Sequence, residues 1–188
     1  MRPNFIVLLI GILCAATGCK RVDDDLMPMR VGKSWRYSVK SGFNSYVLPT
    51  KVAREISVAN TKGFELDGAL GTSRLAWTEK GLVAEKLNNS QFIPPLPLLT
   101  NDGSATKWSG VVINIDRTTQ STATTSQKAD EEIELGVEKV RAVKSTVNLQ
   151  LGKNQVELLT WFQPGKGIVM QEQRTNGTLL VRLSIVEN

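Results

Sequence analysis

Apolar and polar positions follow two different patterns along the chain. From Pro3 to Cys19 no residue is charged, and residues 5–13 are apolar throughout apart from Gly11. Later segments are shorter and alternate, and the cleanest is Thr-Val-Asn-Leu-Gln-Leu at residues 146–151. Strict alternation places one set of side chains on a buried face and the other in water, as in a β-strand. The pattern therefore predicts one apolar N-terminal segment followed by β-strands.

Turn signals separate the alternating segments. Asn176-Gly177 is the strongest hairpin signal in the chain, because both residue types tolerate positive φ. It leads into residues 179–186, where leucine, valine and isoleucine share one face. Helical signals are scarce, and only residues 129–135 could form a turn or two of helix. We expect an all-β fold, mostly antiparallel, built as a curved sheet or a half-open barrel.

The two halves of the mature sequence resemble each other. Trp35 and Trp108 each follow a short Gly-containing segment, and Trp77 and Trp161 each precede a Gly turn and an apolar pair. Two similar β units would explain this spacing, and a chance likeness between hairpins is the alternative. The predicted boundaries are a single β domain at 29–188 with pseudo-repeats at 29–90 and 97–174.

The N-terminal segment has the features of a secretory signal. Arg2 is the only charge before Cys19, and small residues follow the apolar centre. A basic start, a short apolar core and small residues at its end are typical of signal peptides. The uncharged run of 17 residues is shorter than the roughly 20 apolar residues of a membrane-spanning helix. A short anchor helix remains the alternative.

The end of this segment, Ala16-Thr17-Gly18-Cys19, resembles the lipobox of bacterial lipoproteins, although Ala16 stands where that family usually has Leu or Val. The resemblance implies cleavage between Gly18 and Cys19 and acylation of Cys19, with palmitate among the acyl groups. It also implies a signal peptide at 1–18 and a tether at 19–28. Lys20 follows the cysteine where an inner-membrane retention signal would have Asp, which implies an outer-membrane anchor facing the periplasm. An ordinary signal with a free Cys19 is the alternative.

The amino-acid composition excludes several kinds of catalytic and metal site. The chain has no histidine, and its two cysteines are Cys14, inside the signal, and Cys19. A Ser-His-Asp triad, a Cys-His pair and nearly all zinc sites are therefore excluded from the mature domain. We expect no metal, no other cofactor and no enzyme activity. The net charge is +5, but no basic cluster interleaves with aromatic residues, so we expect no nucleic-acid partner.

A few residues remain as candidates for a site. Five aromatic residues have two interpretations: they form a platform that binds a sugar or a lipid, or they are part of a buried core. Ser104 and Lys107 match the spacing of a Ser-x-x-Lys hydrolase, but the segment after them is strand-like. The candidate ligand-facing aromatics are Trp35, Tyr37, Trp77, Trp108 and Trp161.

A second resemblance covers most of the mature chain. Residues 31–37, Val-Gly-Lys-Ser-Trp-Arg-Tyr, with Trp161 to Val169, resemble a group of uncharacterised β-rich envelope lipoproteins with a VGxxWxY motif. The resemblance implies a fold and no activity. We therefore expect a membrane-anchored, non-catalytic binding or scaffolding module that holds an apolar ligand or an envelope protein. A structural accessory subunit that binds through its strand edges is the alternative, and a hydrolase is disfavoured.

Overall fold

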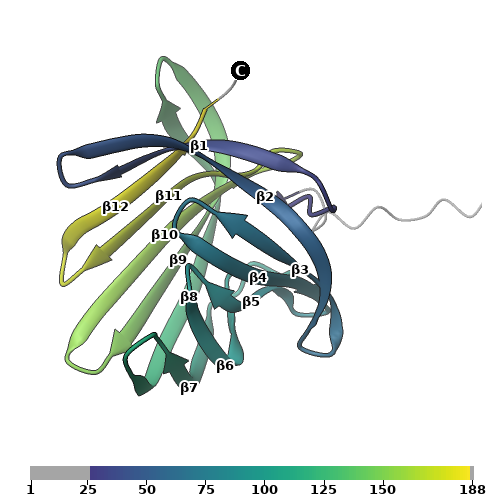
Figure 1. The fold of residues 1–188 in the computed structure, drawn as a ribbon, viewed down its shortest axis with the longest axis vertical. Helices are drawn as coiled ribbons and strands as arrows, with labels where there is room; N and C mark the ends of the chain where they lie inside the picture. The colour runs from purple at the N-terminus through teal and green to yellow at the C-terminus, as the bar shows by residue number, and fades with distance from the viewer. Residues whose placement is uncertain (1–25, 187–188) are drawn as a thin grey trace, which may run out of the picture.

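The computed structural model describes residues 26–186, and within them twelve strands form one sheet that closes into a barrel (Figure 1). The predicted all-β antiparallel fold is confirmed, but the barrel is closed, whereas the sequence predicts a curved sheet or a half-open barrel. The strands are β1 Ser34–Ser41, β2 Asn44–Val58, β3 Thr61–Gly68, β4 Gly71–Thr78, β5 Gly81–Leu87, β6 Ser90–Pro97, β7 Thr106–Ile113, β8 Thr118–Leu135, β9 Glu138–Leu151, β10 Asn154–Gln163, β11 Gly167–Thr175 and β12 Thr178–Ile185.

Closure of the barrel depends on one short ladder. Each strand pairs with the next along the chain, and β1 also pairs with β12 from Tyr37↔Ile185 to Lys40↔Arg182. Every strand of the described chain therefore has a neighbour on both sides. A closed sheet of this kind has no edge along its full length, but β8 beyond Thr125 and β9 before Val143 pair only with each other.

Alternate side chains point into the barrel and form its main core. On β1 the buried residues are Trp35, Tyr37 and Val39, and on β7 they include Trp108 and Val112. These side chains belong to one continuous hydrophobic cluster with inward-facing residues of the other strands. The period-2 pattern read from the sequence thus selects the inner face.

The two ends of the barrel differ. We call the proximal end the one where the described chain begins, at residues 26–33, and the distal end the one with the turns β1–β2, β3–β4, β5–β6, β7–β8, β9–β10 and β11–β12. In Figure 1 the described chain begins on the right of the barrel, and distal turns such as β1–β2 and β11–β12 lie at the left. Met27 is buried at the proximal end, where the indole of Trp77 donates a hydrogen bond of 3.3 Å to its carbonyl oxygen.

The β6–β7 connection fills part of the proximal end. Leu98 and Leu99 of this connection are buried in the main core. Inward-facing polar side chains of β8 and β9 bind its backbone. The bonds are Thr125 Oγ1 to the Pro97 carbonyl at 2.8 Å, Ser145 Oγ to the Leu98 carbonyl, Gln127 Nε2 to the Thr100 carbonyl at 2.9 Å, and the Thr100 amide to Gln127 Oε1 at 2.9 Å.

Strands β8 and β9 extend past the barrel as a bent hairpin, whose turn lies at the top of Figure 1. The pairing register shifts between Lys128 and Glu131, and Asp130 there has a φ of 58°. Ile133 of this hairpin packs with Trp161 and their neighbours in a second buried cluster. The expected helical turn at residues 129–135 is wrong, because β9 supplies pairing partners to residues 131–135 and Ile133 has a buried position to fill.

The four tryptophans lie on corresponding strands of the two six-strand halves. Trp35 and Trp108 are on β1 and β7, while Trp77 and Trp161 are on β4 and β10. The second pair does not share a face. Trp77 packs on the main core, whereas Trp161 belongs to the second cluster. The pseudo-repeat and its boundaries stay a prediction.

Candidate functional site

Four of the five candidate aromatics lie on the inner face of the barrel. Trp35, Tyr37 and Trp108 belong to the main core, and Trp77 packs against it. Trp108 also meets Phe92 edge to face, with ring centroids 6.1 Å apart. They are therefore brought into one interior, but they do not form an exposed platform.

The polar groups of these four residues bind the chain's own backbone. The Trp108 indole donates to the Pro94 carbonyl at 2.9 Å, and the Trp35 indole donates to the carbonyl of Lys166. The Tyr37 hydroxyl donates to the Ile168 carbonyl at 2.8 Å. Burial raises the pKa of Tyr37, so this hydroxyl keeps its proton at neutral pH. With these bonds made, the aromatic polar groups have no donor left for a ligand.

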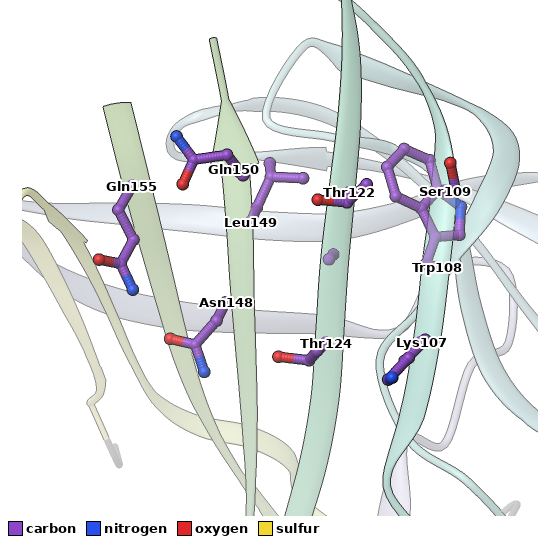
Figure 2. Close-up of a pocket in the computed structure, with 10 residues that line it drawn as sticks. Lys107, Trp108, Ser109, Thr122, Thr124, Asn148, Leu149, Gln150 and Gln155 are labelled. Carbon is purple, nitrogen blue, oxygen red and sulfur yellow. The ribbon is translucent and has the colours of Figure 1, made fainter. Parts of the chain in front are cut away.

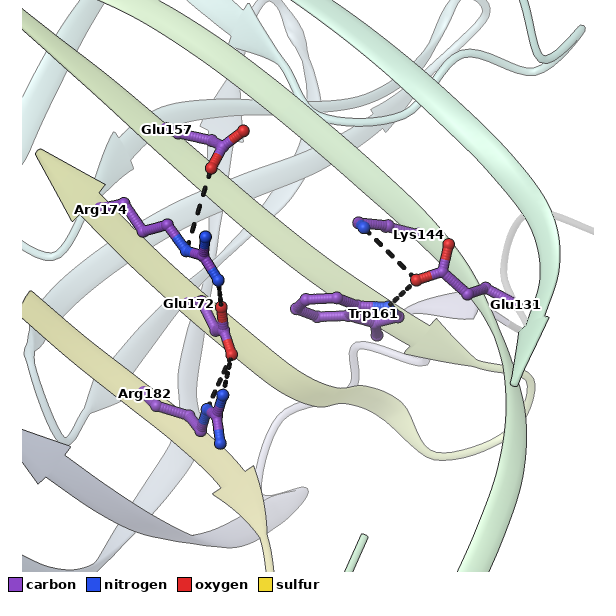
Figure 3. A network of polar contacts seen from close by, with 7 residues as sticks. All are labelled: Glu131, Lys144, Glu157, Trp161, Glu172, Arg174 and Arg182. Atoms are coloured by element: carbon purple, nitrogen blue, oxygen red, sulfur yellow. Dashed lines mark hydrogen bonds and ion pairs between the residues drawn. The ribbon is translucent and has the colours of Figure 1, made fainter. Parts of the chain in front are cut away.

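Trp161 lies on the opposite face of the sheet, because its neighbour Phe162 points into the main core. Figure 3 shows Trp161 with Glu131 and Lys144. Its indole donates to Glu131 Oε1 at 3.2 Å, and the Lys144 ammonium lies 5.0 Å from its ring centroid. Burial by itself raises the pKa of the Glu131 carboxyl, but the Trp161 hydrogen bond and the Lys144 charge outweigh it, and the pKa is lowered. This group ties the β8–β9 hairpin to β10.

A second polar group on the outer face centres on Glu172 of β11, also drawn in Figure 3. Glu172 is buried, and its two oxygens accept hydrogen bonds from Arg182 Nε at 2.7 Å and Arg174 at 2.9 Å. Burial raises the pKa of this carboxyl, but the two guanidinium groups outweigh it, so the pKa lies below its ordinary value. All the acid's acceptors are turned toward arginines, which indicates a structural clamp between β11 and β12.

A polar hollow of about 520 Å³ lies on the outer face of strands β7 to β10 (Figure 2). Its outward side chains are amides and hydroxyls, with Lys107 as the one charged residue among those that line it in the described chain. The alternation with the inward residues Trp108, Ala123 and Leu149 places these groups on the solvent side. The outward residues are Lys107, Ser109, Thr122, Thr124, Asn148, Gln150 and Gln155.

The interior contains an apolar cavity of about 330 Å³ toward the distal end. This volume lies at the lower end of the range for small-molecule sites, about 300 to 1,000 Å³. Most of the wall consists of aliphatic side chains from opposite sides of the barrel, with Phe92 as the aromatic member. The apolar lining residues are Leu87, Phe92, Leu96, Val112, Val147, Leu149, Leu151, Val156 and Leu158.

Further apolar side chains continue this wall to the distal rim. Tyr46 is the cross-strand partner of the buried Val39, and Leu48 is the partner of the buried Tyr37, so both face inward. Tyr46 is nevertheless 54% exposed, and Leu48 is 37% exposed. Inward-facing apolar residues with this much exposure indicate that the interior is unfilled near the distal turns.

The polar residues at the cavity are all uncharged. Asn88 lies in the β5–β6 turn, and Ser90 begins β6. Asn114 follows β7, and Gln173 lies on β11 between the apolar partners Leu158 and Val181. No ionisable side chain is among the residues that line the cavity within the described chain. The site can therefore hold an apolar group and hydrogen-bond a polar one, and it offers no acid, base or nucleophile pair.

Sequence reasoning missed this cavity, although it found some of its strands. The alternation at residues 146–151 correctly indicates that Val147, Leu149 and Leu151 share a face. Alternation cannot show whether the facing side chains meet across the barrel. Asparagine is a common turn residue, so the sequence indicates turns at these positions, but nothing in it indicates that the asparagines line a cavity.

Other predicted sites lie elsewhere or beyond the structure. Gly18 and Cys19 lie outside the described residues, as do the signal at 1–18 and most of the tether. Ser104 donates its hydroxyl to Asp102 Oδ1 at 2.7 Å. Residues 26–186 contain no group of three or more carboxylate, cysteine or histidine side chains placed to hold a metal. None of the helices in that range has the length and apolar character needed to span a bilayer.

Comparisons with known proteins give weak likenesses to three solved structures. No family model matches the chain, and no curated protein matches it. A candidate lipoprotein from Parabacteroides distasonis is 12% identical over 85% of this chain and 96% of its own, with a TM-score of 0.44. A candidate exported protein of Bacteroides fragilis with a YmcC-like fold has the same identity and coverages and a TM-score of 0.37. The hypothetical lipoprotein YmcC of Escherichia coli is 10% identical over 89% of each chain, with a TM-score of 0.42. At these values the likenesses assign no function.

Proposed function

We propose that this chain is a non-catalytic lipoprotein of the bacterial envelope whose barrel binds an apolar ligand. The apolar cavity of about 330 Å³ at the distal end carries the proposal. Apolar walls with a few converging polar groups are the usual composition of a small-ligand site. The exposure of the inward-facing Tyr46 and Leu48 supports an opening at the same end.

The position of the N-terminus supports the orientation. The described chain begins at the proximal end, and the cavity lies toward the distal end. An acylated Cys19 would therefore hold the proximal end toward the membrane and leave the cavity facing the periplasm. We place the anchor in the outer membrane, because Lys20 follows the cysteine.

The other functional classes have less support. A structural accessory subunit that binds through strand edges would have to use the projecting part of the β8–β9 hairpin, where the two strands pair only with each other, because the barrel strands have neighbours on both sides. A Ser-Lys hydrolase needs the two side chains together, whereas the Ser104 hydroxyl is engaged by Asp102 and Lys107 lines the outer hollow. The binding function is the one for which the barrel offers a site.

Lipidation is tested by the intact mass of the protein isolated from a bacterial envelope. We expect a chain that begins at Cys19 and carries the added mass of acyl groups. The Cys19→Ala variant should lose that added mass. A wild-type chain without acyl mass would contradict the anchor and leave the cavity proposal to its own test.

Ligand binding is tested by photolabelling of the full chain in lipid nanodiscs with a long-chain alcohol that carries a diazirine in its alkyl chain. We expect label on cavity residues such as Leu149 and Leu158, identified by peptide mapping. Leu158→Trp fills the cavity and should reduce this label at least several-fold. Asn148→Trp is the matched control, because Asn148 lies across from Glu157 on the outer face, beside Leu158. Label confined to the outer surface, or unchanged by Leu158→Trp, would overturn the binding function.

A further inference from the structure

The polar groups at the cavity differ from the other turn residues in having no partner. The Asn89 side chain accepts from the Thr72 amide at 3.1 Å, and the Asn176 side chain accepts from the Gln155 amide at 2.9 Å. These asparagines link their turns to the neighbouring hairpins. By contrast, the side chains of Asn88, Ser90, Asn114 and Gln173 make no hydrogen bond to any part of residues 26–186.

Gln173 shows the contrast most clearly. Its cross-strand partners are Leu158 on β10 and Val181 on β12, both apolar and both facing inward. An amide between two aliphatic side chains gains nothing from packing that a leucine would not supply. The polar atoms of Gln173 are not among the buried atoms without a partner, so water can reach them in the open cavity. A ligand group at the cavity would supply a hydrogen-bond partner.

The charge of the ligand follows from the lining. A carboxylate or phosphate in an apolar cavity is stabilised best by a cation, because moving an unpaired ion out of water costs far more free energy than moving a neutral group. Arg174 follows Gln173 in the chain, but its guanidinium binds Glu172 on the outer face. No lysine or arginine is among the residues that line the cavity in the described chain.

We propose that the cavity binds a single-chain amphiphile with an uncharged, hydrogen-bonding head, such as an alcohol, an amide or a neutral sugar. This inference rests on the proposed function and names its ligand class. The alkyl chain lies against Leu149, Leu151 and Leu158, and the head meets the free amides of Asn88, Asn114 and Gln173. The volume of about 330 Å³ favours one short chain over two.

The test compares two photoreactive probes that differ only in their head. A long-chain diazirine alcohol and the diazirine fatty acid of the same length are presented to the full chain in nanodiscs at a pH where the acid is ionised. We expect the alcohol to label the cavity residues at least fivefold more than the acid does. Each signal is normalised to the label on the nanodisc lipids, which corrects for partition into the bilayer.

A charge variant makes the test specific for the head site. Gln173→Lys places an ammonium at the cavity and should raise labelling by the acid until it equals or exceeds labelling by the alcohol. Gln155→Lys is the control, because Gln155 lines the outer hollow and the substitution adds the same charge outside the cavity. It should leave the preference for the alcohol unchanged.

The outcomes separate the two proposals. Equal or stronger labelling of the cavity by the acid in the wild-type chain would overturn the neutral-head inference and keep the binding function. An unchanged preference in Gln173→Lys would also overturn it, because the head would then lie away from Gln173. Absence of cavity label from both probes would overturn both proposals together.

Discussion

The indole nitrogen of Trp108 and the carbonyl oxygen of Pro94 form a hydrogen bond of 2.9 Å across a weakly paired part of the barrel. Strands β6 and β7 pair only between residues 91–93 and 111–113. Beyond that point the prolines of β6 have no N–H to donate. The side chain of Trp108 thus takes over the link between the two strands where the backbone cannot supply it.

Trp108→Phe should weaken this link without emptying the core. Phenylalanine keeps an aromatic ring near Phe92 but cannot donate to Pro94. We expect a loss of about 1 to 3 kcal/mol in the free energy of unfolding, from the lost bond and the smaller ring. Urea unfolding measures it. Trp77→Phe is the comparison, because its bond to Met27 is longer, at 3.3 Å. A larger loss in Trp77→Phe would argue against the link at Pro94.

Gly110→Ala tests how closely β6 and β7 approach. A Cβ on Gly110 would lie 2.3 Å from the Ile93 carbonyl oxygen and 2.6 Å from the Trp108 ring. Backbone cannot move aside as a flexible side chain can, so we expect a destabilisation of about 2 to 3 kcal/mol. Thermal unfolding measures the change. Ser109→Ala, at the exposed neighbouring position, should change stability little, and a similar loss in both variants would contradict the steric explanation.

Local sequence predicts the strands and turns well for a physical reason. Alternation and turn chemistry act between residues close in the chain, and the Asn176-Gly177 turn indeed has φ values of 50° and 82°. Local patterns do not predict closure of the barrel, because closure pairs Tyr37 with Ile185 from opposite ends of the domain. A half-open and a closed barrel have the same local pattern.

The candidate site was harder to predict than the fold. The aromatic residues were the natural choice from composition, yet their polar groups bind backbone carbonyls that no local pattern identifies. Trp161 lies on the outer face, next to the inward-facing Phe162, but polar and apolar residues do not alternate over 156–162, so the sequence does not indicate which face Trp161 occupies. The cavity arises from unfilled space between distant strands, which depends on barrel geometry and not on any one segment.

Gln127→Ala should loosen the β6–β7 connection. Gln127 both donates to and accepts from the backbone of Thr100, with each bond at 2.9 Å. Removal of both bonds should cost about 1 to 3 kcal/mol locally. Hydrogen exchange of the Thr100 amide should therefore become at least fivefold faster. Amides in the middle of β9 serve as the internal control, and equal acceleration there would indicate global destabilisation and contradict a local role.

Glu172→Gln should make stability less dependent on pH. The two arginines hold the pKa of the Glu172 carboxyl below its ordinary value in the folded chain. A carboxyl with a lowered folded pKa contributes stability above its unfolded pKa, and this contribution is lost as the pH falls through the folded value. At neutral pH we expect the variant to be less stable by about 1.5 to 3 kcal/mol, as for hydrogen bonds to a charged group.

The difference in unfolding free energy between the wild-type chain and Glu172→Gln should shrink when urea unfolding is repeated at falling pH. Protonated Glu172 and glutamine are both neutral. Glu132→Gln is the control, since its ion pair with Lys139 is more than half exposed and should contribute little at any pH. A Glu172→Gln difference that stayed constant down to a pH below about 3 would mean that the clamp acts through shape and neutral hydrogen bonds, and that the lowered pKa contributes nothing to the stability of β11 and β12.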